Sequence, residues 1–494
     1  MSTEPTFLAI DLGATSGKIF AFQLKENALK MEEIYRFPNI PVKVLDGIFW
    51  DVLGLWREVK QGISLAFKKF GDLRSIAVDT WGLDFALLDR RGEILGNPHH
   101  YRDPRTEGIM EEVFRLVPKE EIYFRTGIQF MRVNSLYHLY YLATRQRSLL
   151  EIADRLLMMP DLFSYWLSGA KVCEFTDATT TQFYSPSKRG WDEELLQMLS
   201  IPTHFLAEII PPGTLLDTMR ASIASELGCS EKPRIIATAS HDTASAVVAA
   251  PISDQHSAYI SSGTWSLVGA EVSEPVITKK SLEYNFTNEG GAFGKFRLLR
   301  DVQGMWLLEE CRRAWKEKEK EYSYEELIKL AEKAQPLLAF IDPDNPRFIS
   351  PPDMIKEIER YLDETGQRKP KGAGGMARLI LESLAFKYRY VLEKLQDLLG
   401  IKIKRIHVVG GGSRNWLLNQ LTADFTQTEV VAGPVEATAT GNALIQATAL
   451  KMFRGHESLR EIVRNSFPLK IYQPSPSTKI EDAYSQFLST TGLE

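Results

Sequence analysis

The chain has 494 residues, of which 59 are Lys or Arg and 64 are Asp or Glu, so its formal net charge is −5. This length exceeds what one hydrophobic core usually supports, and we expect two large domains. The small net charge argues against non-specific nucleic-acid binding, which needs clustered cationic surface, and a hydrophobic fraction of 44% excludes a largely disordered chain.

Features that bear on location predict a cytoplasmic protein with no nucleic-acid or membrane partner. Its three cysteines, Cys173, Cys229 and Cys311, are too few and too widely spaced for a disulfide framework or a CxxC metal site, which favours reduced thiols. The first residues lack the basic region and long apolar run of a signal peptide. The sequence contains no run of about 18 apolar residues, so no membrane span is predicted.

The first predicted element is a hairpin whose turn consists largely of small residues. A buried strand at 7–10 leads into Asp11-Leu12-Gly13-Ala14-Thr15-Ser16-Gly17-Lys18, and a second apolar strand begins at Ile19. Because Gly, Ser and Thr present backbone N–H groups and hydroxyls, this turn is a candidate phosphate site. Asp11 would repel a phosphate unless a cation lay between them, and Mg²⁺ prefers oxygen ligands. An ordinary hairpin with Asp11 as a turn residue is the alternative.

This turn does not match the common phosphate-loop motif. Gly13 to Lys18 is one residue too short for G-x(4)-G-K-[ST], and Ile19 stands where a metal-binding hydroxyl would lie.

Two later strands end in polar segments that are candidates for a substrate site. After a helix at 53–67, the strand 74–79 ends at Asp79-Thr80-Trp81-Gly82-Leu83-Asp84, where carboxylates and an indole ring are suited to bind a polyol. The strand 234–239 ends at Ser240-His241-Asp242 before an apolar helix. Asp242 is either a general base or metal-linked carboxylate at the strand end, or a helix cap. His241 is a candidate donor to a substrate oxygen, with a structural role as the alternative.

Pro251–Gln255 is the predicted domain boundary, and a second hairpin follows it. A strand at 258–260 leads into Ser261-Ser262-Gly263-Thr264-Trp265-Ser266 and another strand from Leu267. Ile10 to Ser16 and Ile260 to Ser266 share the pattern I-x-x-G-x-x-S, offset by 250 residues, which is close to half the chain. The offset predicts a duplicated domain in which each copy supplies one phosphate-binding turn.

The remaining segments complete an α/β pattern. The charged run 316–321 is predicted to be a solvated helix face, and further helices are expected at 377–399 and 416–425. Between these two helices, a strand at 405–409 is followed by Gly410-Gly411-Gly412. This junction does not spell G-x-G-x-x-G, and it is either a tight turn or a place where a ring or phosphate meets bare backbone. Strands alternating with helices predict the α/β class.

Taken together, seven segments in order resemble the FGGY carbohydrate kinases of the actin-like ATPase superfamily. They are DLGATSG at Asp11, DTWGLDF at Asp79, SHDTASA at Ser240, SSGTWSL at Ser261, TNEGGAFG at Thr287, VVGGGSRN at Val408 and AGPVEATATGN at Ala432. The resemblance runs from about Leu8 to Gly455 and implies two ribonuclease-H-like domains flanking a deep catalytic cleft. An N-terminal domain over 1–250 would hold the sugar, the first hairpin and the catalytic Asp, and a C-terminal domain over 251–494 would hold the second hairpin and the adenosine.

The resemblance also implies an activity and a set of site residues. The activity is ATP-dependent phosphorylation of a ketose, L-rhamnulose at its C1 hydroxyl, with ATP and Mg²⁺, by a monomer or homodimer. Asp242 is then the catalytic base and Asp11 supports Mg²⁺. Sugar contacts are expected at Gly82, His241 and Asp301, in addition to Asp79 and Trp81 from the polar segment above. ATP contacts are expected at Ala14, Thr15, Ser16, Gly17, Lys18, Thr264, Glu309 and Gly411.

Two departures from the family pattern leave the substrate open. Asp301 stands where the family has Asn at a sugar contact, and Glu309 stands where it has Gln near the nucleotide. Each replaces an amide by a carboxylate and removes hydrogen-bond donors, so L-fuculose and L-xylulose remain alternative substrates. A non-catalytic, actin-like nucleotide-binding protein is a second alternative, although no additional substrate-binding domain or low-complexity arm is visible.

Overall fold

The computed structural model describes residues 4–229, 231–453 and 456–493, which form two compact units. The first unit contains the chain up to Pro251 together with Glu271–Leu298 and Glu436–Phe467. The second contains Ile252–Ala270, Leu299–Val435 and the chain from Pro468. The main break lies at the predicted boundary, but the first unit also takes two segments from the second half of the chain. The division into domains at 1–250 and 251–494 therefore stays a prediction.

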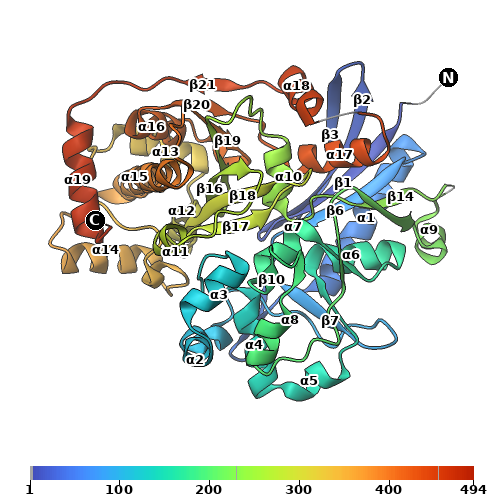
Figure 1. Cartoon of the computed structure of the whole chain (residues 1–494). Coiled ribbons are helices and arrows are strands. Elements are labelled where there is room, and N and C mark those ends of the chain that lie inside the picture. Colours follow the sequence, from blue (N-terminus) through green and yellow to red (C-terminus); the bar gives the residue numbers. More distant parts are fainter. Residues whose placement is uncertain (1–3, 230, 454–455, 494) are drawn as a thin grey trace. The chain divides into compact units, whose positions relative to one another are not determined.

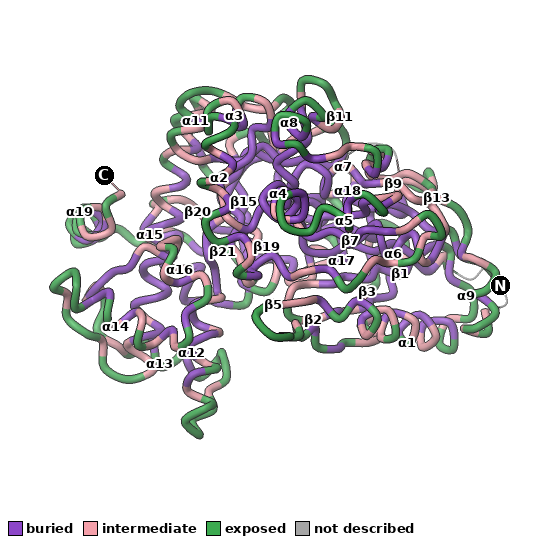
Figure 2. The backbone as a smooth tube through the Cα atoms, turned by 90° about the horizontal axis from the view of Figure 1, so that it is seen from below, coloured by how far each residue is buried: buried purple, intermediate pink, exposed green. Residues whose placement is uncertain are grey.

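The first unit is built on a mixed sheet with the strand order β13-β14-β6-β1-β2-β3 (Figure 1). Strand β1 is antiparallel to β2 and parallel to β6, β6 is parallel to β14, and β14 is antiparallel to β13. All residues of β1 are buried, as its apolar sequence TFLAIDL predicts, and Figure 2 draws it within the purple interior. The strands are β1 (Thr6–Leu12), β2 (Ser16–Lys25), β3 (Ala28–Pro38), β6 (Ser75–Thr80), β13 (Thr214–Thr218) and β14 (Arg234–Ala237).

The second unit contains a sheet with the same plan. Its strand order is β17-β18-β16-β15-β19-β20-β21, where β17 (Thr287–Gly290) and the start of β18 belong to the first unit. With β17 left aside, the order of the other six strands corresponds to that of the first sheet. Strand β15 is antiparallel to β16 and parallel to β19, β19 is parallel to β20, and β20 is antiparallel to β21. Matching order and direction confirm the α/β class and agree with the duplication that the repeat predicts. The strands are β15 (Ser257–Ser262), β16 (Trp265–Val272), β18 (Phe296–Gln303), β19 (Arg405–Val409), β20 (Glu429–Ala432) and β21 (Lys470–Tyr472).

Helices and short strands surround these sheets in each unit. The predicted helices correspond to α1 (Val52–Phe70), α15 (Gly372–Leu399) and α16 (Trp416–Thr426). Other elements of the first unit include β7 (Phe85–Leu88), α4 (Ser135–Arg145), β8 (Arg155–Met158), α6 (Met159–Ser168), β9 (Val172–Glu174), α7 (Phe175–Ala178), α10 (Asp242–Val248), β17 (Thr287–Gly290) and α17 (Ala437–Ala449). The second unit also has α12 (Trp306–Lys316), α13 (Tyr324–Lys333), α14 (Met354–Glu364) and α19 (Lys479–Thr491).

The prediction of a helical face over 316–321 is wrong, because α12 ends at Lys316. The chain then turns back on itself, with the Lys320 backbone N–H donating to the Trp315 carbonyl oxygen at 3.0 Å. Glu319 has a φ of 59°, in the left-handed region that interrupts a helix. The Lys316 ammonium and Glu321 carboxylate still pair, at 3.0 Å and both well exposed, so the run is solvated as expected but not helical.

Helices α10 and α17 pack closely at Gly441. A Cβ atom at this position would lie 1.8 Å from the backbone oxygen of Ser245 in α10. No L side chain fits at that distance unless the two helices separate. Since α10 begins at the candidate base Asp242, and α17 follows Glu436 directly, this packing fixes the start of one helix against the other.

We predict that Gly441→Ala destabilises the protein. Helix propensity alone would favour Ala by about 1 kcal/mol, but the backbone overlap opposes it, and overpacking typically costs about 1–3 kcal/mol. Urea unfolding should therefore show a lower midpoint for the variant. Gly190→Ala is the matched control, because a Cβ there meets no atom closer than 3.9 Å. An equal or higher midpoint for Gly441→Ala would contradict the packing.

Candidate active site

Three charged residues form a row across neighbouring strands of the first sheet. The pairing register places Lys18 of β2 opposite Asp11 of β1, and Asp11 opposite Asp79 of β6. Paired residues on adjacent strands point to the same face of a sheet. The Lys18 ammonium lies 3.5 Å from Asp11 Oδ2, and it contacts Glu436 Oε2, just before α17, at 3.1 Å. The first phosphate-turn candidate is thus tied to both strand and helix.

The acidic groups in this row raise one another's pKa. Burial raises the pKa of Asp11, and the charges of Asp242 and Glu436 add to the effect, while Lys18 opposes it. Burial also holds the pKa of Asp79 well above its ordinary value, and the charge of Asp11 contributes. In return, the charge of Asp11 raises the pKa of Lys18 despite its burial. The row therefore favours any further cation that comes near it.

The Asp79 carboxylate is held by α17 and has one oxygen without a partner. Asn442 of α17 donates from Nδ2 to Asp79 Oδ2 at 2.5 Å, whereas Asp79 Oδ1 is buried and accepts no hydrogen bond from any described residue. Across the described residues, no group of three His, Cys, Asp or Glu side chains is arranged to hold a metal ion. Mg²⁺ keeps several water ligands and needs few protein carboxylates, so this acidic row fits such an ion without a full protein cage.

The turn between β1 and β2 is closed by hydrogen bonds from its own backbone and from Asn39. Gly13 N–H donates to Ser16 O at 3.0 Å, and Asn39 donates from its backbone to Thr15 O and from Nδ2 to Gly13 O. Ala14 and Thr15 therefore lie in one fixed turn, and Ser16, Gly17 and Lys18 follow it as the first residues of β2, so the second strand begins three residues before the predicted Ile19.

Asp242 is brought to the same end of the sheet by the segment that follows β14. Thr80 N–H donates to Ser240 O at 2.9 Å, and Thr80 forms a parallel bridge with His241, so residues 240–241 continue the sheet beside the end of β6. Asp242 is the first residue of α10, and its side chain is 30% exposed. The neighbouring Asp11 and Asp79 are buried. Asp242 is therefore the accessible carboxylate of this group.

A buried acidic residue that the sequence did not single out holds the backbone before Asp242. Glu174 Oε2 accepts hydrogen bonds from Ser240 N at 2.9 Å and from Thr176 N and Oγ1. Thr176 Oγ1 in turn accepts from His241 N at 3.1 Å. Burial raises the pKa of Glu174 to about 7, although these donors oppose the shift.

The His241 ring lies between Asp242 and a buried ion pair. Its Nε2 is 3.5 Å from Asp242 Oδ1, and its Nδ1 is 3.0 Å from Arg297 Nη2 and 3.4 Å from Glu289 Oε2. Arg297 is fully buried, and Nη2 also donates to Glu289 Oε2 at 3.0 Å. Glu289 belongs to the TNEGG segment that the sequence highlighted. Arg297 lies in a largely apolar strand, and nothing in the sequence pattern distinguishes it from a solvent-facing residue.

Gly82 lies where a side chain would crowd this ring. A Cβ atom there would be 3.3 Å from His241 Nε2 and 3.1 Å from Thr180 Cγ2. The structure thus brings Gly82, His241 and Asp242 together, as predicted for a sugar site.

Trp81 belongs to an aromatic cluster, with its ring centroid 4.0 Å from that of Trp50. Both indole Nε1 groups donate to Asp84 Oδ2, Trp50 at 2.6 Å and Trp81 at 2.9 Å. Trp81 is 5% exposed, so its ring is largely covered by these neighbours, and the predicted stacking on a sugar stays a prediction.

The second unit repeats the hairpin turn at Ser262-Gly263-Thr264. Met305 N donates to Gly263 O, and Gly304 N and Trp306 N donate to Thr264 O, which fixes Thr264 against the start of α12. Gly410 and Gly412 approach Ser262 closely: a Cβ on Gly412 would lie 2.0 Å from Ser262 Oγ. A Cβ on Gly411 would meet no atom within 4 Å, so Gly411 borders open space. Gly433 N donates to Val408 O, which places the Gly433 turn beside this junction.

The two residues that depart from the family pattern also lie in the second unit. Asp301 is half-buried in β18. Glu309 lies in α12, where its Oε2 accepts from Arg312 at 2.7 Å and from the Tyr324 hydroxyl at 2.5 Å. The carboxylate at position 309 therefore has local donors that would suit it better than an amide.

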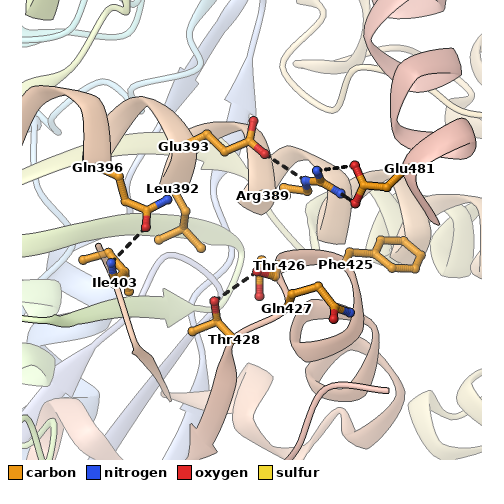
Figure 3. A pocket seen from close by; sticks show the side chains of 10 residues that line it. All are labelled: Arg389, Leu392, Glu393, Gln396, Ile403, Phe425, Thr426, Gln427, Thr428 and Glu481. Carbon is orange, nitrogen blue, oxygen red and sulfur yellow. Dashed lines mark hydrogen bonds and ion pairs between the residues drawn. The ribbon is translucent and has the colours of Figure 1, made fainter. Parts of the chain in front are cut away.

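A cavity of about 230 Å³ in the second unit is distinct from all predicted site residues of that unit (Figure 3). Its polar lining groups mainly satisfy one another: Arg389 pairs with Glu393 and Glu481, and Gln396 accepts from Ile403 N. We do not assign a function to it. Separately, no helix within the described ranges is long and apolar enough to cross a membrane.

Solved structures share this fold. A gluconate kinase from Lactobacillus acidophilus superposes with a TM-score of 0.78 at 18% identity, covering 99% of this chain and 96% of that one. A Plasmodium falciparum glycerol kinase with ADP superposes with a TM-score of 0.77 at 15% identity, covering 99% and 98%. These likenesses establish the two-domain fold of sugar kinases.

Sequence comparison defines the family. Residues 6–249 match the N-terminal domain, and residues 258–450 the C-terminal domain, of the FGGY family of carbohydrate kinases. A rhamnulokinase from Bacteroides thetaiotaomicron is 43% identical over 484 residues, covering 98% of this chain and 99% of the relative. A rhamnulokinase from Bacillus subtilis is 39% identical over 469 residues, covering 95% of each. The chain belongs to the FGGY family of carbohydrate kinases, which confirms the resemblance and identifies an enzyme.

We predict that Asp84 makes the stability of the protein fall between about pH 4 and pH 7. Burial raises its pKa to about 7, although donors from Trp50, Trp81 and Tyr101 oppose the shift, whereas an unfolded Asp titrates near pH 3.9. The fold thus favours the neutral acid and loses stability as Asp84 ionises.

The check is urea unfolding at pH 5 and pH 8. Asp84→Asn stays neutral, so its stability relative to wild type should rise from pH 5 to pH 8. Asp217→Asn, at an exposed position of β13, is the control. Its stability relative to wild type should not change over this range. A pH-independent difference for Asp84→Asn would contradict the assignment.

Proposed function

We propose that this enzyme transfers the γ-phosphoryl group of ATP to the C1 hydroxyl of L-rhamnulose, giving L-rhamnulose 1-phosphate and ADP. Support for the substrate comes from the full-length similarity to rhamnulokinases at 39–43% identity. Support for the chemistry comes from one observation: Asp242, an accessible carboxylate, stands at the end of the sheet beside the row formed by half-buried Lys18 and by buried Asp11 and Asp79. A carboxylate in that position is suited to accept a proton from a substrate hydroxyl.

The residues of the first unit have separate parts in the proposed mechanism. Asp242 orients the C1 hydroxyl and takes its proton as the oxygen attacks phosphorus in line. Lys18 and the turn at Ala14–Gly17 bind phosphate oxygens, and the ammonium stabilises the charge that spreads over them. His241 and Gly82 contact the sugar. In the second unit, Thr264 would bind phosphate, and Gly411 would meet the adenosine where its bare backbone borders open space.

Mg²⁺ is part of this proposal. When bound, it would neutralise charge on the ATP phosphates. Asp11 is the residue that would support it, largely through water, and the unpartnered buried oxygen of Asp79 together with the raised pKa values of both carboxylates fits a cation nearby.

Two further proposals concern where the protein is located and how it assembles. The cytoplasm is the proposed location, supported by the few and widely spaced cysteines, and a monomer or homodimer is the proposed assembly.

An ADP-release assay over a panel of ketoses tests the substrate. We expect kcat/KM for L-rhamnulose to exceed that for L-fuculose and L-xylulose by about tenfold or more, the range that a few pocket contacts provide. A higher value for another ketose would reassign the substrate within the family. If no ketose stimulated ADP release, the non-catalytic nucleotide-binding alternative would replace the proposal.

We predict that Asp242→Asn lowers kcat by roughly 10²–10⁴-fold, the usual contribution of a general base. The amide has nearly the same shape, so ketose binding measured by calorimetry should largely survive. Asp217→Asn, at an exposed position of β13, is the control and should leave kcat unchanged. Turnover near the wild-type rate in Asp242→Asn would remove this residue from the mechanism.

A further inference from the structure

We propose that Arg297 is a positioning residue that fixes the tautomer of His241, keeping Nδ1 unprotonated and the proton on Nε2, beside Asp242. The proposal rests on the proposed function for the use of that proton, but the tautomer itself follows from the contacts of the ring. These contacts all lie within the first unit.

Arg297 has only N–H donors and no acceptor, and it stays charged under all ordinary conditions. Its Nη2 lies 3.0 Å from His241 Nδ1, so Nδ1 must offer a lone pair to make this hydrogen bond. A protonated Nδ1 would turn the contact into a clash of two donors, one of them cationic. The remaining ring proton is therefore on Nε2.

Glu289 is the competing partner of Nδ1 and is itself controlled by Arg297. Its Oε2 is 3.4 Å from Nδ1, farther than the guanidinium, and it accepts from Arg297 Nη2 at 3.0 Å. Burial works to raise the pKa of Glu289, but the Arg297 charge is the largest opposing effect, and this pKa lies below its ordinary value. Arg297 thus occupies the carboxylate that would otherwise draw the ring proton to Nδ1.

The rest of the Arg297 side chain shows why it keeps this position. It is fully buried, and its Nε donates to the Gly290 carbonyl oxygen at 2.8 Å. Gly290 N–H in turn donates to the Thr179 hydroxyl oxygen at 2.7 Å. A buried charge held by a carboxylate, a carbonyl and an imidazole has little freedom to move away from Nδ1.

As a consequence, a hydrogen-bond donor, His241 Nε2–H, lies beside a hydrogen-bond acceptor, the Asp242 carboxylate. His241 Nε2–H lies 3.5 Å from Asp242 Oδ1, and Gly82 leaves room next to Nε2. A ketose carries its C1 hydroxyl next to an oxygen on C2. In the proposed site, the C1 hydroxyl donates to Asp242 and the oxygen on C2 accepts from Nε2–H. The charged or titratable groups that face the ring are Asp242, Glu289 and Arg297.

The direct test is ¹⁵N NMR of enzyme labelled in histidine, without substrate. The chain has eight histidines, and His241→Gln identifies the His241 signals by their loss. We expect Nδ1 unprotonated and Nε2 protonated in the wild type at pH 8. A protonated Nδ1 in the wild type would overturn the proposal without any variant of Arg297. Because no sugar is needed, this result is independent of whether the ketose assignment succeeds.

The second test uses a pair of substitutions. In Arg297→Gln, the Glu289 carboxylate is free to accept a hydrogen bond from Nδ1–H, so NMR should show Nδ1 protonated, and the KM for ketose should rise by about tenfold or more, the cost of a lost hydrogen bond to substrate. The KM for ATP should change by less than about twofold. In Arg297→Gln/Glu289→Gln, the new amide can donate to Nδ1, so NMR should return to the wild-type tautomer and the ketose KM should recover most of the loss.

A merely structural role for Arg297 predicts the opposite pattern. The double variant would then be no better than Arg297→Gln, since it loses both members of a buried ion pair. That outcome, or an unchanged tautomer in a folded Arg297→Gln enzyme, overturns the proposal. Glu289→Gln alone is the control, and with Arg297 still in place its tautomer should match the wild type.

Discussion

The structure of the first unit depends on keeping several carboxylates close together at one end of a buried sheet. Asp11 and Asp79 face each other on adjacent parallel strands, where like charges repel and burial makes ionisation costly. Lys18 lies opposite Asp11, and Asn442 donates to Asp79 from α17. Without these partners the site could not retain its acidic character inside the protein, so the positions of β2 and α17 follow from an electrostatic requirement.

Only the first of the two similar sheets has to hold carboxylates close together. Asp11 pairs in register with Lys18 and Asp79, whereas Ser261, at the matching position of the second sheet, pairs with Leu267 and Val409. The second copy thus has a neutral hydroxyl between two apolar residues where the first has three charges. Strand order and direction were retained while the charges were not. The geometry of the hairpin and the chemistry placed on it are therefore separable properties of this fold.

The sequence predicted those parts of the site that are local. The hairpin turns, the strand ends at Asp79 and Asp242, and the helices after them can be read from Gly-rich turns and apolar periods within a few residues. The supporting contacts could not be read in this way, because Glu174 reaches Ser240 across 66 positions and Arg297 reaches His241 across 56. Asn442 lies 363 positions from Asp79. A buried Arg in an apolar strand looks like any surface residue until the fold shows what surrounds it.

The charged run at 316–321 shows that a prediction from local sequence can also be wrong. The spacing of opposite charges favoured a helix over this run. Each such pair stabilises a helix by only a few tenths of a kcal/mol. This preference is too weak to extend α12 through the turn that the chain makes after Lys316. At Asp242 the opposite holds. The segment before it is fixed by the Glu174–Thr176 pair, the ring beside it by Arg297, and the helix it begins by contact with Gly441. Three independent supports on one short segment leave the carboxylate little freedom, and such preorganisation is what proton transfer from a bound hydroxyl requires.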